Sequence, residues 1–304
     1  MTTVNKRVYS PQAHTLNGID AGGEVGVLID EGYDDEMEAQ PGDLAVGVVD
    51  RATQFHRGQI TTQDWIHMID LLTGTVGNYV FWQRKSGAAA ATGYVKHTIT
   101  NPKIWQTQLR MNQKGYLECV ADYECMAASE AATIKDMHAM TDSQAAPTGL
   151  AAARGGWRVT TATHGSISIY HLTGFDVMIT AGLLKASNDA DVAYTAVDVR
   201  EDGLRVSGSL SFEDMSVKAV SLELKSQELL LAAAGSLAIR VVQSAGATSK
   251  DITIARTIIM RSTVRGGTRP GYTGVQASWR QTNDPTTPLT LAGTNKIIVI
   301  ADAV

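Results

Sequence analysis

Hydrophobic and polar residues alternate with a period of two along several stretches of this 304-residue chain. In residues 104–111 (IWQTQLRM), tryptophan, threonine, leucine and methionine alternate with glutamine and arginine. Residues 115–125 (GYLECVADYEC) carry leucine, cysteine, alanine and tyrosine on one face and acids on the other. A strand that buries one face has this period. The pattern predicts strands in which Glu118, Asp122 and Glu124 face solvent or a lumen.

The second half of the chain contains two stretches with the same alternation. The predicted inward residues are Met260, Ser262 and Val264 in one, and Val275, Ala277 and Trp279 in the other. Gln276 and Ser278 take outward positions. A slip of one residue would exchange the faces of a strand. Agreement of phase between the halves therefore supports an internal duplication.

Short blocks also recur in the same order in the two halves. The matching blocks are LNGID at 16–20 with LTGFD at 172–176, Gly26 with Gly182, Gly77 with Gly235, and Gly115-Tyr116 with Gly271-Tyr272. Ordered blocks at a nearly constant offset indicate a repeat. The predicted division is a first tube-like β-domain over residues 1–126, a linker over 127–157, and a second over 158–304 with an extra C-terminal strand.

One helix is expected in each copy. The stretch TTQDWIHMIDLLTG offers Thr62 as an N-cap, apolar side chains at helical spacing from Trp65 to Leu72, and Gly74 as a stop. A shorter counterpart covers residues 226–235. The expected fold class is mainly β with α (α+β): two tandem copies of a β-sandwich or curled sheet, each with one packed helix.

Two further segments stand out. The chain ends on NKIIVIADAV, an apolar strand without a visible counterpart, which is expected to pair inside the protein or with a neighbour's sheet. Its candidate interface residues are Ile297, Ile298, Val299 and Ile300.

The densest charge cluster puts six acids into nine residues: Asp30, Glu31, Asp34, Asp35, Glu36 and Glu38. Because Gly32 is misplaced for a calcium loop, a solvated or partner-facing loop is expected there.

Composition and motifs limit the kinds of function that the chain is expected to have. The net charge of −5 disfavours a free-standing nucleic-acid binder, since such proteins use Lys and Arg to displace phosphate counterions. The first residues lack the apolar core of a signal peptide, and Arg240 interrupts the most apolar run, so we expect a soluble chain that does not cross a membrane. Cys119 and Cys125 are expected to be buried free thiols. No GxSxG, HExxH or CxxC occurs. No catalytic residue, cofactor or metal is therefore predicted, and the protein is not expected to be an enzyme.

The passage SGSLSFEDM followed by ELLLAAAGSLAIRV, from Ser207 onward, carries a resemblance. Together with the order of strand, acidic loop, strand, helix and paired strands, it resembles the major tail tube proteins of long-tailed bacteriophages, of the type with two fused tube domains. The resemblance implies a structural virion protein whose homotrimeric, pseudo-hexameric rings stack into a hollow tail tube for DNA passage.

The same resemblance implies partners and a location. The partners would be further copies of the chain, other phage tail proteins, and duplex DNA that passes without specific binding. The protein would be made in the host bacterial cytoplasm and end in the virion tail. The helices would lie outside the β-wall, and the acidic loop would bridge one ring to the next. Two alternatives stay open: another phage structural protein, such as a decoration or baseplate protein, and an enzyme or carbohydrate-binding module. Long hollow tubes would separate the first reading from the second, and a ligand-induced stability shift would favour the third.

Overall fold

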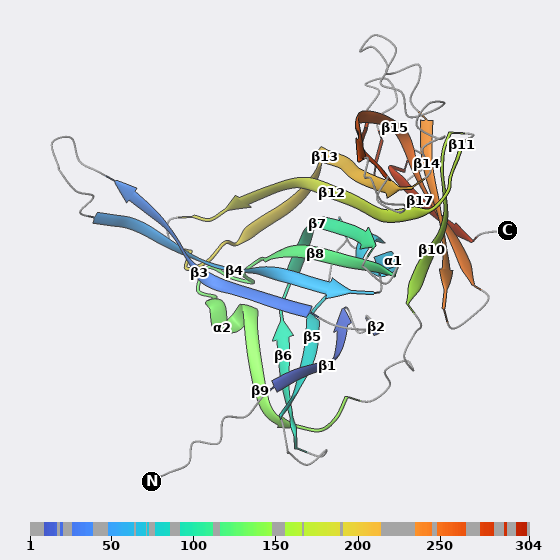
Figure 1. The fold of residues 1–304 in the computed structure, drawn as a ribbon. Helices are drawn as coiled ribbons and strands as arrows, with labels where there is room; N and C mark the ends of the chain where they lie inside the picture. Colours follow the sequence, from blue (N-terminus) through green and yellow to red (C-terminus); the bar gives the residue numbers. More distant parts are fainter. Residues whose placement is uncertain are drawn as a thin grey trace.

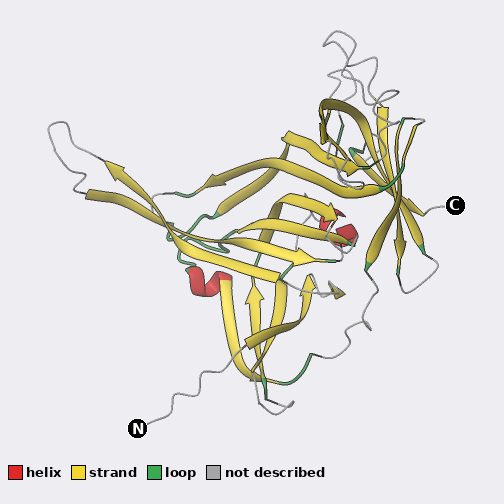
Figure 2. Ribbon diagram, viewed as in Figure 1, coloured by secondary structure: helices red, strands yellow, loops and turns green. Residues whose placement is uncertain are grey.

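The structure is a computed structural model that describes residues 9–16, 19–20, 26–38, 48–63, 65–70, 72, 77–85, 92–111, 116–147, 156–165, 167–188, 191–213, 235–244, 248–265, 274–282, 289–290 and 296–302. Strands dominate this part of the chain (Figure 2). In the first half they are β1 (Tyr9–Leu16), β2 (Ile19–Asp20), β3 (Gly26–Glu38), β4 (Val48–Thr62), β5 (Tyr79–Lys85), β6 (Tyr94–Ile99), β7 (Pro102–Met111), β8 (Leu117–Cys125) and β9 (His138–Gln144). In the second half they are β10 (Trp157–His164), β11 (Ile167–Ile169), β12 (Leu172–Ala186), β13 (Ala196–Phe212), β14 (Gly235–Gln243), β15 (Ser249–Arg265), β16 (Gly274–Gln281) and β17 (Ile298–Asp302).

The expected α+β class is wrong, because the fold is nearly all β. The described chain is 77% strand and 4% helix. Its helices, α1 (Trp65–Asp70) and α2 (Ile134–Met137), are only six and four residues long. The predicted helix start at Thr62 fails because Thr62 is still paired with Cys119 in the β4–β8 ladder. The helical spacing itself was interpreted correctly, since Trp65, Met68 and Leu72 are fully buried. The second predicted helix, at 226–235, lies outside the described residues except for Gly235, which begins β14.

The strands form two antiparallel sheets (Figure 1). One has five strands in the order β2-β1-β5-β6-β9. The other has twelve, in the order β11-β10-β14-β15-β16-β13-β12-β7-β8-β4-β3, with β17 paired to β15. The second sheet therefore runs without a break through both halves of the chain. Figure 1 shows the end of the β3–β4 hairpin projecting from the rest of the fold as an arm.

The strand pairings of the first half recur in the second. The series β2-β1-β5-β6-β9 corresponds to β11-β10-β14-β15-β17, and β3-β4-β8-β7 corresponds to β12-β13-β16-β15. The long strand β15 thus replaces two strands: residues 249–257 pair as β6 does, and residues 257–265 pair as β7 does. Register shifts recur at matching points, namely Pro11/Ala13 with Val159/Thr161 and Ile104/Gln106 with Ile259/Arg261. We call β1–β9 the first unit and β10–β17 the second unit.

Two glycines fix the residue equivalence between the units. A Cβ on Gly58 would lie 2.1 Å from the carbonyl oxygen of Leu28 and against the ring of Tyr123. A Cβ on Gly208 would lie 2.0 Å from the carbonyl oxygen of Asp176 and against the ring of Trp279. Each glycine leaves room for an aromatic ring across the sheet backbone. Leu28 therefore corresponds to Asp176, at an offset that differs from the one the sequence blocks indicated.

The match between LNGID and LTGFD is consequently a coincidence. Residues 19–20 form β2, whose counterpart is β11, whereas residues 172–176 begin β12, whose counterpart is β3. The equivalent of Gly26 is Gly174, and not Gly182. Gly26 and Gly174 occupy the same place, beside Thr61 and Ser211 respectively. Five-residue matches are too short to specify register, whereas cross-strand pairing specifies it residue by residue.

The predicted linker and the supposedly unique terminal strand are both corrected. Residues 127–147 contain α2 and β9, and β9 extends the first sheet by pairing with β6. β17 is the counterpart of β9, since the N–H of Ala255 donates to the carbonyl of Ile297 as the N–H of Thr100 donates to that of Met137. Each unit therefore ends on a strand that pairs with its own sheet.

The core lies between the two layers of strands in each unit. The alternating residues of β8 and β16 fill it: Leu117, Cys119, Ala121, Tyr123, Cys125, Val275, Ala277 and Trp279 are all buried. α1 closes one end of the first unit, where the indole of Trp65 meets that of Trp157 edge to face at 5.9 Å between ring centroids. Cys119 and Cys125 are buried thiols outside any disulfide, as the sequence predicted.

Candidate functional site

The continuous run β3-β4-β8-β7-β12-β13-β16-β15 has one face in the core and one polar face. Side chains of paired residues point to the same side of a sheet. On the polar face, Asp122 accepts hydrogen bonds from the side-chain amides of Gln59 and Gln106, each at 2.9 Å. Thr180 donates to the amide oxygen of Gln106 at 3.2 Å. This ladder of polar side chains crosses from the first unit into the second.

The predicted outward residues occupy this face with one exception. Gln276 is exposed, and Glu118, Asp122 and Ser278 are partly exposed. Arg110 donates to Glu118 at 3.1 Å. Whether the face lines a lumen stays a prediction. Glu124 is the exception, because it is only 3% exposed.

Glu124 is buried by a segment that local sequence could not reveal. Lys185, on β12 of the second unit, brings its Nζ to 3.5 Å from Glu124 and 3.3 Å from Asp34. Burial raises the pKa of Glu124, and the nearby lysine opposes this rise. Glu124 therefore has the outward position that alternation predicts for an isolated strand. The second unit covers this position in the folded chain.

The two units are joined strand to strand. β7 pairs antiparallel with β12, from Asp176 opposite Arg110 to Thr180 opposite Gln106. The amide of Gln108 donates to the carboxylate of Asp176 at 2.6 Å across this junction. Burial raises the pKa of Asp176, and the bond from Gln108 acts in the opposite direction. One edge strand of each unit, β7 in the first and β12 in the second, is thus paired within the chain.

A second contact reinforces the junction. The connection between β12 and β13 lies against the first unit, where the N–H of Gln54 donates to Val192 O and that of Ala127 to Tyr194 O, both at 2.9 Å. The hydroxyl of Tyr194 donates to Asp34 at 2.7 Å. The joint between the units is therefore a strand ladder supported by a docked turn.

The other edge of each unit is open. Among the described residues, β3 pairs only with β4, and residues 258–265 of β15 pair only with β16. In Figure 1, β3 lies at one end of the long run of strands and β15 lies at the other. A row of unpaired backbone groups on an edge strand is a template for pairing with another chain.

The acidic run is part of this edge, so the predicted loop is wrong. Asp30, Glu31, Asp34, Asp35, Glu36 and Glu38 all lie on β3, which pairs with β4 as far as Glu38. Polar residues on both faces hid the strand period, because an edge strand beside a projecting arm has little core to bury. Asp30 accepts from Arg57 at 2.8 Å. A role in bridging rings stays a prediction.

The terminal strand pairs inside the chain. Ile297 and Ile298 are 2% and 6% exposed, whereas Val299 is 44% exposed. Ile300 is partly buried and lies opposite Ile252 in the β15–β17 ladder. A role for these residues between chains stays a prediction.

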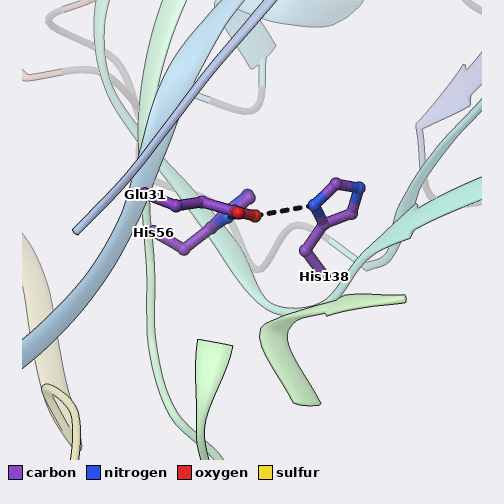
Figure 3. Close-up of side chains that lie close together, drawn as sticks. All are labelled: Glu31, His56 and His138. Atoms are coloured by element: carbon purple, nitrogen blue, oxygen red, sulfur yellow. Dashed lines mark hydrogen bonds and ion pairs between the residues drawn. The ribbon is translucent and has the colours of Figure 1, made fainter. Parts of the chain in front are cut away.

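An acid and two histidines converge inside the first unit (Figure 3). Glu31 comes from β3, His56 from β4 and His138 from the start of β9. The same carboxylate oxygen of Glu31 lies 2.9 Å from Nδ1 of His56 and 2.7 Å from Nδ1 of His138. The three ligand atoms lie within 4.8 Å of one another, the one such group of three among the described residues. This arrangement can bind a proton or a metal ion.

Further polar groups hold the two imidazoles. The hydroxyl of Tyr123 lies 3.3 Å from Nε2 of His56, and Nδ1 of His97 lies 3.1 Å from Nε2 of His138. Nε2 of His97 in turn lies 3.2 Å from the amide oxygen of Gln83. Burial lowers the pKa of His56, and the Glu31 carboxylate opposes that effect. Burial and the neighbouring His138 lower the pKa of His97 to about 4.

The sequence did not reveal this cluster. Glu31 was interpreted as one acid of a loop, and the histidines lie far from it along the chain. No spacing rule joins residues on three strands of two different sheets. No sequence pattern distinguishes His56 and His138 from the other five histidines of the chain.

No protein-family profile and no curated protein matches the chain. No described helix is long and apolar enough to cross a membrane.

Proposed function

We propose that the chain is a structural subunit of a bacteriophage tail tube, whose copies join edge to edge into rings of three that stack around a channel for DNA. One observation carries the proposal. The two units within a chain are joined through β7 and β12, while the equivalents of these two edges are open at opposite ends of the same sheet.

The internal junction supplies a template for contact between chains. β3 is to the first unit what β12 is to the second, and residues 257–265 of β15 correspond to β7. Pairing β15 of one chain with β3 of the next would repeat the β7–β12 ladder. In the internal register, Arg261 would lie opposite Gly32, and Thr263 opposite Asp30. Such a contact is heterologous and closes when its rotation divides a full turn.

Charge supports this pairing. β3 presents an acidic edge, and Arg261 is exposed on the open part of β15. Diagonal neighbours on paired strands lie about 7–8 Å apart, within reach of an arginine side chain, so Arg261 would meet Asp30. Acids along both faces of an edge strand also oppose pairing between two copies of β3. β3 is thus suited to pair with β15 of another chain and unsuited to pair with a second copy of β3.

Ring size is consistent with DNA passage. Each chain contributes eight strands to the continuous run, so three chains give three times eight. Twenty-four strands spaced about 4.8 Å apart and tilted 35–45° close into a barrel of roughly 45–50 Å backbone diameter, which leaves a channel wide enough for a duplex. If the polar face lined this channel, a duplex would meet its amides, hydroxyls and acids together with exposed arginines, of which Arg57 and Arg110 are paired with Asp30 and Glu118.

Electron microscopy and charge reversal test the proposal. Negative-stain images of the concentrated protein should show rings with threefold symmetry and short hollow tubes. Arg261→Glu should abolish them, because it places an acid against the acidic edge. Arg280→Glu is the matched control: Arg280 is also exposed but lies on β16, one strand in from the open edge. Rings of Arg261→Glu as abundant as those of the unchanged protein, or a monomer at high concentration, would contradict the proposal.

A further inference from the structure

We propose that Glu31, His56 and His138 form a binding site for a divalent transition-metal ion, with zinc as the best-suited ion, which ties the two sheets of the first unit together. The donor set is two imidazole nitrogens and one carboxylate oxygen. Imidazole favours zinc and its neighbours in the first transition series, and magnesium and calcium prefer all-oxygen sites. This inference does not depend on tube assembly.

The distances suit a metal ion after a small movement. Ligand atoms about 2.0–2.1 Å from zinc lie roughly 3.3–3.5 Å from one another in a tetrahedron. The two Nδ1 atoms now lie 2.9 and 2.7 Å from the Glu31 oxygen. Each pair has to separate by about half an ångström, and the part-exposed Glu31 on an edge strand can retreat by that much. Three protein ligands leave a fourth position for water or a neighbour's group.

The surrounding groups can also partner the tautomer that a metal needs, although without an ion the contact with the Glu31 carboxylate requires a proton on each Nδ1. A metal-bound imidazole donates its other N–H to a nearby acceptor, which fixes the ring. Here Nε2 of His56 faces the oxygen of Tyr123, and Nε2 of His138 faces Nδ1 of His97. His97 can accept that bond and donate from Nε2 to the amide oxygen of Gln83. Both Nδ1 atoms are then free for the ion.

The second unit shows that the fold does not need these polar residues. The strand registers assign Glu31 to Ile179, His56 to Val206, His97 to Ile252 and His138 to Ile298. These four residues of the second unit are aliphatic and at most 6% exposed. The same pairing is therefore held by apolar packing alone.

Buried imidazoles cost free energy relative to aliphatic side chains of similar size. The first unit bears that cost at His56 and His97, which are at most 6% exposed, and hydrogen bonds connect them with His138 and the part-exposed Glu31. A bound ion explains both facts, because it replaces the lost hydration of the ligands and links β3 and β4 to β9. The ion would also fix β3, the edge that the proposed ring contact uses.

Calorimetric titration of the full chain with ZnCl2 tests the site. We expect saturable binding of one ion per chain, unaffected by excess MgCl2. Glu31→Gln and His138→Ile should each weaken binding at least tenfold, and His97→Ile, which removes the group behind His138, by about 10–100-fold. His171→Asn is the control, because His171 is exposed in the second unit and asparagine tolerates its positive φ of 54°.

Circular dichroism establishes that each variant is folded before titration. If His138→Ile does not fold, Glu31→Gln still decides, since its side chain is isosteric and partly exposed. The proposal is overturned if the unchanged chain shows no saturable zinc binding. Equal affinity in Glu31→Gln and the unchanged chain, or loss of binding in His171→Asn, overturns it as well. Ring formation is not a readout here, so failure of the metal site and failure of the tube proposal are separate results.

Discussion

Replacing Gly208 by alanine should destabilise the protein more than the same change at its counterpart Gly58. The added Cβ at Gly208 would lie 2.0 Å from the carbonyl oxygen of Asp176 and 2.6 Å from Cζ2 of Trp279. An ordinary contact between a carbon atom and such an oxygen begins about 1.4 Å beyond the first of these distances. Asp176 lies on β12, which is paired on both sides, and Trp279 is only 2% exposed. Neither neighbour has room to withdraw.

The magnitude follows from these constraints. Overpacking a core costs typically about 1–3 kcal/mol and occasionally more, and at Gly208 a carbonyl oxygen and a buried ring clash with the added atom at once. We expect Gly208→Ala to lower the free energy of unfolding by about 3–5 kcal/mol. At Gly58 the added Cβ would lie 2.1 Å from Leu28 O and 2.7 Å from the hydroxyl of the buried Tyr123, but Leu28 lies on β3, which pairs with β4 alone among the described strands. That edge can shift outward, so about 1–3 kcal/mol is expected.

Thermal and urea unfolding of the two variants measure the difference. Gly274→Ala is the control, since its Cβ would meet only Phe212 O, at 3.5 Å. It should change the melting temperature little, whereas Gly208→Ala should lower it by about 5–10 °C. If Gly208→Ala melts with Gly274→Ala, the close-approach argument is refuted. An equal loss at Gly58 and Gly208 would show that β3 is held as firmly as β12.

Three further outcomes are expected. Ala121→Asp should cost about 3 kcal/mol or more, because it buries an unpaired charge at a fully buried position, and Asp122→Ala about 1 kcal/mol; equal melting temperatures would contradict the assigned faces. Burial lowers the pKa of His164, so the unfolded chain binds more protons below about pH 6.5 and stability should fall there with pH. Urea unfolding of His164→Leu should show a weaker pH dependence, and an unchanged one would contradict this assignment. Truncation after Gly293 removes β17 from the β15 edge and should cause aggregation, seen by light scattering; a truncated chain that stays monodisperse would show that β17 is dispensable.

Some expectations failed because a neighbour in space overrode a local pattern. Glu124 has an outward position by strand period, yet Lys185 and the second unit cover it. The helix expected from Thr62 is shortened because the β4–β8 ladder extends through that residue. The acidic run on β3 looked like a loop because alternation appears only where one face of a strand is buried. β3 has an open edge and acids on both faces. In each case the missing information was the identity of the element alongside.

The sequence by itself determined the strands that bury one face, most clearly in β8 and β16, since successive side chains of a strand point to opposite sides whatever surrounds it. It also indicated that the two halves are alike, because equivalent strands need equivalent phase. Only the tertiary structure decided which residues correspond, which edges are joined and which are open, and that Glu31, His56 and His138 meet. Those are relations between strands far apart in the chain. They are set by register and sheet packing, which no local period encodes.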